Sequence, residues 1–229
     1  MSAIATNLQA IRIRIADAAR AAGRSPDSVR LLAVSKTKPL ADVLAAAEAG
    51  QFAFGENYVQ EGAEKALATA ERNFEWHFIG PLQSNKTRQV AEHFAWVHSI
   101  ERLKIAERLS AQRPAALPPL QVCVQVNVSG EASKSGCAPD EALALCLAVA
   151  ALPRLTLRGL MAIPEPSDDA AAQREPFRLL RQIADTVRAA GVPLDTLSMG
   201  MSHDLEAAVA EGATMVRIGT AIFGERNYT

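Results

Sequence analysis

The chain has 229 residues, 49% of them hydrophobic, and a formal net charge of −1 from 24 basic and 25 acidic residues. This length can bury a sizeable core, and the balanced charge gives no electrostatic reason for a nucleic-acid or membrane partner. The three cysteines form no C-x-x-C pair, so we expect neither disulfides nor a metal site. No apolar run is long enough to span a membrane and the N-terminus does not resemble a signal peptide, so we expect a cytoplasmic protein without a membrane anchor.

The expected elements begin with a helix at Ala3–Ala22, where apolar residues recur at helical spacing before Gly23 ends the pattern. Short apolar runs then alternate with amphipathic segments along the rest of the chain. The expected strands are 31–36, 52–55, 75–80, 95–99, 121–127, 155–160, 194–198 and 214–219. The expected helices between them are 40–49, 56–71, 84–93, 101–112, 139–151, 168–190 and 203–211. This alternation is typical of βαβ units and predicts a parallel sheet.

Eight strands with intervening helices predict one α/β domain over residues 1–229, built as a (β/α)8 barrel of the TIM type. Residues 1–23 would form an extra N-terminal helix. A doubly wound open sheet is the alternative. No G-x-G-x-x-G fingerprint follows the first expected strand, which weakens the case for a dinucleotide site.

Lys36 stands at the end of the first expected strand, and Pro39 follows it at the start of the next helix. The carboxyl ends of strands are where α/β proteins place their chemistry, and a partly desolvated lysine can act as an amine nucleophile. Leu32 and Lys36 are an even number of residues apart, so their side chains point to the same face of the first strand. The same holds for Met215 and Arg217 in the last strand. If both sets face inward, barrel closure points Lys36 and Arg217 into the same mouth.

Two segments near the C-terminus have the pattern of anion-binding turns. In the first, Gly200 permits a tight turn and Ser202 is placed to cap a helix that begins at His203. In the second, a strand ends at Gly219-Thr220 and enters a short helical turn. Barrels often bind phosphate with the loops after strands seven and eight and a short extra helix. The pattern therefore favours a phosphate site, although ordinary turn and cap chemistry would give the same residues.

A phosphate site and a nucleophilic lysine in one barrel mouth suit pyridoxal 5′-phosphate (PLP), which carries an aldehyde as well as a phosphate. A Schiff-base aldolase acting on a sugar phosphate would use the same two parts. Arg217 favours PLP, because an arginine is a known partner of the cofactor's ring nitrogen. Because arginine stays protonated, it would leave that nitrogen unprotonated and the ring a weaker electron sink. A structural salt bridge is the alternative for Arg217.

At these residues the chain resembles the YggS/PROSC-type pyridoxal phosphate homeostasis proteins. The similarity covers nearly the whole chain, and several long motifs occur in the order found in that family. Besides the two turns, the motifs lie at Ala33–Pro39, Phe54–Glu61, Trp76–Lys86, Val126–Glu131 with Lys134 and Gly136, and Gly159–Pro164.

The resemblance implies PLP fold type III, a barrel like that of alanine racemase, with PLP held as a Schiff base on Lys36. It places Asn57 near the ring hydroxyl and Arg217 near the ring nitrogen. It implies further cofactor contacts by the phosphate-binding Ser202, Gly219 and Thr220, by Met199 and Gly200 lining the site, and by His77 and Ile79 at a strand end beside the ring. His77 by itself has the pattern of a hydrogen-bonded strand histidine. Glu56 and Glu61 have the pattern of charges that cap a helix N-terminus.

The same resemblance implies a carrier or regulator of PLP supply without robust catalytic turnover, with apo PLP enzymes as possible recipients. A PLP-dependent amino-acid racemase of the same fold is the alternative. Two-base racemisation needs a second acid/base opposite the lysine, and the tyrosines of this chain are Tyr58 and Tyr228 alone. Because alanine racemase dimerises through a further domain that we do not find here, we expect a monomer.

Overall fold

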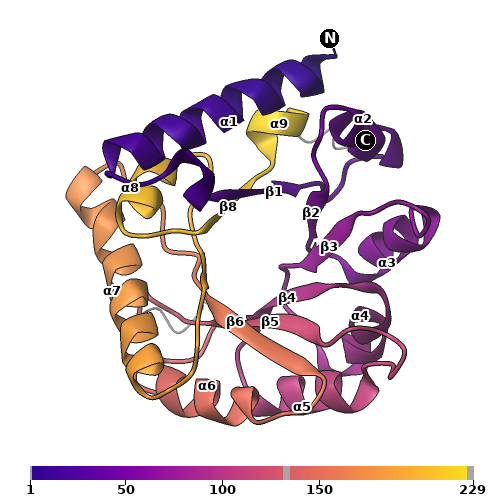
Figure 1. The fold of residues 1–229 in the computed structure, drawn as a ribbon, viewed down its shortest axis with the longest axis vertical. Helices are drawn as coiled ribbons and strands as arrows, with labels where there is room; N and C mark the ends of the chain where they lie inside the picture. The colour runs from indigo at the N-terminus through magenta and orange to yellow at the C-terminus, as the bar shows by residue number, and fades with distance from the viewer. Residues whose placement is uncertain (1, 131–134, 226–229) are drawn as a thin grey trace.

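The computed structural model describes residues 2–130 and 135–225 and contains a closed barrel of parallel strands in the order β1 to β8 (Figure 1). The expected α/β barrel is therefore confirmed, and an open sheet is excluded because β1 pairs with β8. The strands are β1 Arg30–Val34, β2 Ala53–Glu56, β3 Glu75–Phe78, β4 Trp96–Ile100, β5 Leu120–Gln125, β6 Leu155–Met161, β7 Thr196–Ser198 and β8 Met215–Ile218.

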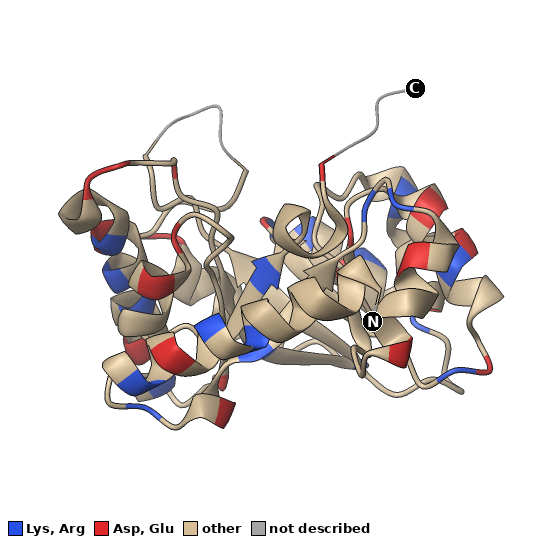
Figure 2. Cartoon of the chain, turned by 90° about the horizontal axis from the view of Figure 1, so that it is seen from above, with Lys and Arg blue, Asp and Glu red and all other residues tan. Residues whose placement is uncertain are grey.

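Helices surround the barrel as an outer layer (Figure 1). They are α1 Ala3–Ala21, α2 Leu40–Glu48, α3 Val59–Ala68, α4 Thr87–His93, α5 Leu103–Gln112, α6 Ala142–Ala150, α7 Ala170–Ala189, α8 Leu205–Ala210 and α9 Thr220–Phe223, with short 3₁₀ helices η1 Pro26–Ser28 and η2 Ser84–Lys86. Figure 2 shows that basic and acidic residues are interspersed along these outer helices. Within the described ranges, none of the helices has the length and apolar character needed to cross a bilayer.

Helix α1 is the extra N-terminal helix, and it lies across the barrel wall beside α8 and α9 (Figure 1). Its buried residues, among them Leu8, Ile11 and Ile15, recur at helical spacing, which explains why this segment folds as an amphipathic helix. Asn7 Nδ2 donates to the carbonyl of Ile222 at 3.0 Å, so the helix is tied directly to α9, the last described helix of the barrel.

Several predicted boundaries were wrong by a few residues. The helix expected from residue 56 begins only at Val59, because Glu56 still pairs with Phe78 as part of β2. The helix expected from His203 begins at Leu205, with Asp204 at its N-cap. These errors arise because the end of a strand depends on its neighbour in the sheet, which local sequence patterns do not contain.

Gly159 in β6 is required by the close approach of β7. A Cβ atom at this position would lie 1.7 Å from the carbonyl oxygen of Thr196. We expect Gly159→Ala to lower the free energy of unfolding by about 2–3 kcal/mol, because backbone must move to accept the methyl group. Chemical denaturation measures this, with Gly55→Ala as the control, since a Cβ there would meet the movable side chain of Ile79 at 3.2 Å. An equal decrease in the free energy of unfolding for Gly159→Ala and Gly55→Ala would contradict the prediction.

Candidate functional site

A cavity of about 290 Å³ lies among segments that follow the C-terminal ends of the strands, where the sequence predicts the site. Its lining confirms that Lys36 and Arg217 share one barrel mouth. The predicted residues that line it are Lys36, Asn57, Ile79, Ser202, Arg217, Gly219 and Thr220. The lining also contains Val34, Ile163, Met201 and His203, which sequence reasoning did not assign to a cofactor site.

The other three predicted residues, His77, Met199 and Gly200, are not among the lining residues of this cavity. His77 and Met199 are fully buried. His77 is the hydrogen-bonded strand histidine that its pattern predicts, since both ring nitrogens have partners within 2.9 Å. Gly200 has a φ of +97°, so it forms the predicted tight turn after β7.

The backbone that presents Lys36 is bent sharply just after β1. Thr37 has a φ of +64°, which is uncommon for a residue with a branched Cβ. The Thr37 amide donates to Glu61 Oε1 at 2.7 Å, and the Lys38 amide donates to the carbonyl of Ser35 at 3.0 Å. These two hydrogen bonds hold the bend and thereby fix where the Lys36 side chain leaves the backbone.

A cluster of charged side chains is hydrogen-bonded to the backbone of this bend. Lys65 Nζ on α3 donates to Glu56 Oε1 at 2.8 Å, to Glu61 Oε1 at 2.7 Å and to the carbonyl of Ser35 at 2.8 Å. Ser35 Oγ donates to Glu56 Oε1 at 2.6 Å. Burial raises the pKa of Glu56, while the charge and hydrogen bond of Lys65 oppose that increase.

The prediction that Glu56 is a charge at a helix N-terminus is therefore wrong, because Glu56 belongs to β2 and binds Lys65. Glu61 does lie in the first turn of α3, as predicted, but its carboxylate binds Lys65 and the Thr37 amide instead of the helix N–H groups. The spacing of Glu61 and Lys65 at i and i+4 is a signal that could have suggested their pairing. The pairing of Glu56 with Lys65 had no such signal, since it depends on how α3 packs on β2.

Asn57 follows β2 directly and supplies a buried polar group to the cavity. Its Oδ1 has no hydrogen-bond partner among the described residues. A buried acceptor without a hydrogen bond costs free energy, so a ligand that donates to Oδ1 would be favoured. Gly80 allows the chain after β3 to pass closely, because a Cβ there would lie 2.2 Å from the Asn57 carbonyl oxygen. The site thus offers one unsatisfied amide oxygen in a fixed place.

Arg217 on β8 is 4% exposed and is held by oxygen atoms from neighbouring strands. Its Nη1 donates to the carbonyl of Ser198 at 2.6 Å and to Ser198 Oγ at 2.9 Å, and its Nη2 donates to the carbonyl of Ala162 at 2.9 Å. Burial lowers the pKa of Arg217 to about 10, so the guanidinium is charged at neutral pH. Three of its five N–H groups are used in this way, which leaves two without a partner in the described part of the chain.

Both predicted anion-binding turns contribute residues to the lining of the cavity. Gly219 and Thr220 stand at the start of α9, and the amides of Thr220 and Ala221 have no hydrogen-bond partner among the described residues. Ser202 also lines the cavity, but it does not cap α8 as predicted. Asp204 is the N-cap residue of α8, and its Oδ1 accepts the Met201 amide at 2.6 Å. The Ser202 carbonyl instead accepts Arg14 Nη1 at 2.9 Å.

Three of the four lining residues missed from the sequence stand beyond strand ends. Ile163 follows β6, and Met201 and His203 belong to the loop after β7, whereas Val34 is the last residue of β1. Tyr58 is 54% exposed and does not line the cavity. Tyr228, Glu131 and Lys134 lie outside the described residues.

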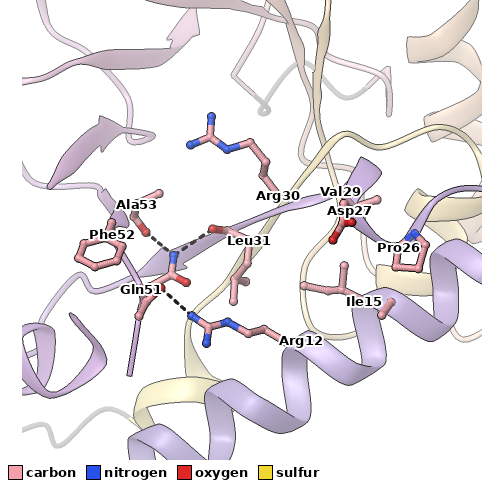
Figure 3. A pocket seen from close by; sticks show the side chains of 12 residues that line it. Arg12, Ile15, Pro26, Asp27, Val29, Arg30, Leu31, Gln51, Phe52 and Ala53 are labelled. Carbon is pink, nitrogen blue, oxygen red and sulfur yellow. Dashed lines mark hydrogen bonds between the residues drawn. The ribbon is translucent and has the colours of Figure 1, made fainter. Parts of the chain in front are cut away.

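A larger cavity of about 490 Å³ lies between α1, the start of β1 and the segment before β2 (Figure 3). Arg12, Arg30 and Gln51 are the lining side chains with polar contacts, and all three hold the fold. Arg12 donates to the carbonyls of Ala49 and Gly50 at 2.9 Å, and Gln51 Nε2 donates to backbone carbonyls of β1 and β2. The smaller cavity therefore remains the candidate site, because it brings together a lysine, an arginine and unsatisfied polar groups.

Comparison with known proteins agrees with this geometry. A family model described as "Alanine racemase, N-terminal domain" matches residues 6–227. The pyridoxal phosphate homeostasis protein of Pseudomonas aeruginosa is 62% identical over 228 residues, which cover 100% of this chain and 98% of that protein. The protein of the same name from Escherichia coli K12 is 56% identical over 237 residues, which cover 100% of this chain and 99% of the relative.

Solved structures give the same result. PipY of Synechococcus elongatus with PLP bound has a TM-score of 0.84 and 37% identity, and the match covers 96% of this chain and all of PipY. Alanine racemase from Corynebacterium glutamicum has a TM-score of 0.74 at 18% identity, with 97% of this chain and 61% of the racemase covered, and so shares the fold. The chain belongs to the alanine racemase N-terminal domain family, within the group of relatives named pyridoxal phosphate homeostasis proteins.

Proposed function

We propose that this protein binds PLP as a Schiff base on Lys36 and takes part in PLP homeostasis without robust catalytic turnover. The observation that carries the proposal is the meeting of Lys36, Arg217 and the start of α9 at one cavity. The names of its relatives and the PLP-bound structure of PipY support it. We further propose that it acts as a single-domain, cytoplasmic monomer and that apo PLP enzymes are the recipients of its cofactor.

The polar groups that line the cavity fit the parts of PLP. The cofactor supplies an aldehyde that condenses with an amine and a pyridine ring that withdraws electrons. Lys36 would supply the amine, Asn57 would face the ring hydroxyl and Arg217 would donate a hydrogen bond to the ring nitrogen. The phosphate would bind Ser202 and the N–H groups at Gly219 and Thr220, where backbone donors converge. Ile79 would pack beside the ring, while Met199, Gly200 and His77 would support the site from behind.

Arg217 also supports the absence of robust turnover. A guanidinium that is charged at neutral pH can donate a hydrogen bond to the ring nitrogen but does not transfer a proton to it. An unprotonated ring nitrogen makes the ring a weaker electron sink, which disfavours carbanion chemistry on a bound amino acid. This arrangement suits storage and exchange of the cofactor better than its catalytic use.

Visible spectroscopy tests the proposed function. Adding PLP to the purified protein should give the absorption band of a protonated Schiff base, distinct from that of free PLP. Addition of an apo PLP enzyme should then remove the band as the acceptor gains activity. A wild-type protein that gives no Schiff-base band at any PLP concentration would refute the proposal.

We expect Thr220→Val to weaken PLP binding about tenfold, the effect of losing one hydrogen bond to a charged group. Valine keeps the shape of threonine but removes the hydroxyl at the start of α9. Spectral titration with PLP and with pyridoxal, which lacks the phosphate, measures the effect. The variant should bind pyridoxal as the wild type does. Equal weakening for both ligands would show that Thr220 does not contact the phosphate.

The second candidate function is amino-acid racemisation, and His203 is the observation that favours it. His203 is exposed and lines the cavity, and an imidazole is the side chain that most often serves as a general acid or base. The test is incorporation of solvent deuterium at the α-carbon of alanine or serine, followed by nuclear magnetic resonance (NMR). Incorporation at enzymatic rates that His203→Ala abolishes would establish the racemase, whereas background rates in both proteins would exclude it.

A further inference from the structure

A continuous row of polar side chains crosses the barrel interior behind Arg217, and all of them are buried except Glu75 at its far end, whose side chain is 36% exposed. Arg217 Nη1 lies 2.9 Å from Ser198 Oγ, and Ser198 Oγ lies 2.8 Å from His98 Nδ1. His98 Nε2 lies 2.9 Å from His77 Nδ1, and His77 Nε2 lies 2.8 Å from Glu75 Oε1. The row therefore connects β8, β7, β4 and β3, and we call these five residues the interior chain.

The interior chain has one consistent direction of hydrogen bonding. A carboxylate only accepts, so His77 must donate from Nε2 to Glu75. A neutral His77 then accepts at Nδ1, which requires His98 to donate from Nε2 and to accept at Nδ1. Ser198 must therefore donate its hydroxyl hydrogen to His98, and its oxygen is left to accept from Arg217. Every donor meets an acceptor only if both histidines carry their proton on Nε2.

The charges along the row agree with this direction. Burial lowers the pKa of His77, and burial together with nearby positive charges lowers that of His98 well below its usual range, so both rings are neutral at pH 7. Burial by itself would raise the pKa of Glu75, but the hydrogen bonds from His77 and Arg30 and the positive charge of Arg30 lower it below its usual value. The interior chain thus has a positive guanidinium at one end and a carboxylate at the other, with neutral groups between them.

On the basis of the proposed function, we propose that Glu75, His77, His98 and Ser198 are positioning residues that hold Arg217 against the ring nitrogen of PLP. Arg217 has no ion pair within 4.0 Å among the described residues, so its buried charge is compensated by carbonyl oxygens, by the interior chain and, from a greater distance, by the carboxylate of Asp204. Hydrogen bonds in a row polarise one another in a buried environment, so the carboxylate of Glu75 can act on Arg217 through the histidines.

The far end of the interior chain lies near the opposite face of the barrel. Glu75 Oε1 also accepts Arg30 Nη2 at 2.8 Å, and Arg30 lines the larger cavity (Figure 3). The ring of His77 stacks on Trp96 at 5.1 Å between centroids, which restricts its rotation. The two histidines are therefore fixed in place as well as in protonation, as residues that orient another side chain must be.

The first experiment uses the protein without cofactor. NMR of ¹⁵N-labelled histidine reports the protonated nitrogen of each ring, and His→Gln variants assign the signals. At pH 7 we expect His77 and His98 both as the neutral Nε2–H tautomer. A neutral Nδ1–H tautomer or a doubly protonated ring at either position would overturn the proposal, whatever the protein binds.

The second experiment compares two buried serines after PLP is added. Ser198→Ala breaks the interior chain, whereas Ser99→Ala removes a buried hydroxyl that has no hydrogen-bond partner among the described residues. We expect Ser198→Ala to bind PLP about tenfold more weakly and to shift the visible band. Glu75→Gln should shift the band in the same direction, since it removes the charge but keeps an acceptor. Ser99→Ala should match the wild type.

The outcomes separate the two proposals. A missing band in the wild-type protein refutes the proposed function itself. A normal wild-type band, together with a Ser198→Ala protein that folds and matches Ser99→Ala in affinity and spectrum, refutes only the positioning role. If Ser198→Ala does not fold, Glu75→Gln and the histidine tautomers still decide, because an unchanged Glu75→Gln spectrum would overturn the proposal.

Discussion

Lys36→Ala is expected to abolish the Schiff-base absorption band entirely, even with excess PLP. Alanine removes the amine that condenses with the aldehyde and leaves the phosphate turns and Arg217 in place. Noncovalent binding through the phosphate should persist, with affinity reduced at least about a hundredfold, since the covalent link contributes several kcal/mol. Spectral titration with PLP measures both the band and the residual binding.

Lys38→Ala is the matched control for this substitution. Lys38 stands two residues further along, and its Nζ donates to the carbonyl of Glu225 at 2.6 Å, away from the lining of the cavity. The control should retain the wild-type band and affinity. A band that survives in Lys36→Ala, or is lost equally in Lys38→Ala, would contradict the assignment of Lys36 as the amine.

Lys65→Met is expected to lower the free energy of unfolding by about 3–5 kcal/mol, the cost of removing one partner from a buried ion pair. Glu56 is completely buried, and Lys65 is the cation that compensates its charge. Without Lys65, Glu56 must take up a proton or stay as an uncompensated charge. Equilibrium unfolding in urea measures the loss.

Two further variants make this result specific. Glu56→Gln combined with Lys65→Met removes both charges and should lose less stability than Lys65→Met alone. Lys104→Met on α5 replaces an exposed lysine and should change the free energy of unfolding by less than about 0.5 kcal/mol. If Lys65→Met is no more harmful than Lys104→Met, then the cluster does not stabilise the bend that presents Lys36.

Much of the barrel and of its site follows from patterns within single segments. Alternating strands and helices predict the βαβ repeat, and closure of eight strands makes β1 and β8 neighbours. Leu32 pairs with Arg217 in the observed register, which is why side-chain parity was enough to bring Lys36 and Arg217 into one mouth. The turn at Gly200 was predictable because glycine readily adopts the positive φ that a tight turn requires, and the observed φ is +97°.

The rest depends on contacts between segments that are distant in sequence. Glu56 pairs with Lys65 because β2 extends one residue further and α3 packs against it, neither of which local spacing specifies. His98 and Ser198 are 100 residues apart, and the barrel interior alone brings them within hydrogen-bond distance. Sequence reasoning assigned no role to His98, so it missed the interior chain.

The attachment point of PLP is the most direct test of the proposed function. Borohydride reduction of the protein with PLP makes a Schiff base permanent, and mass spectrometry of the digested protein then identifies the modified lysine. We predict one modified peptide, which contains Lys36, and no cofactor on Lys38, Lys65 or Lys86. Modification of another lysine, or a protein without modification after reduction, would contradict the assignment of Lys36 as the residue that holds PLP.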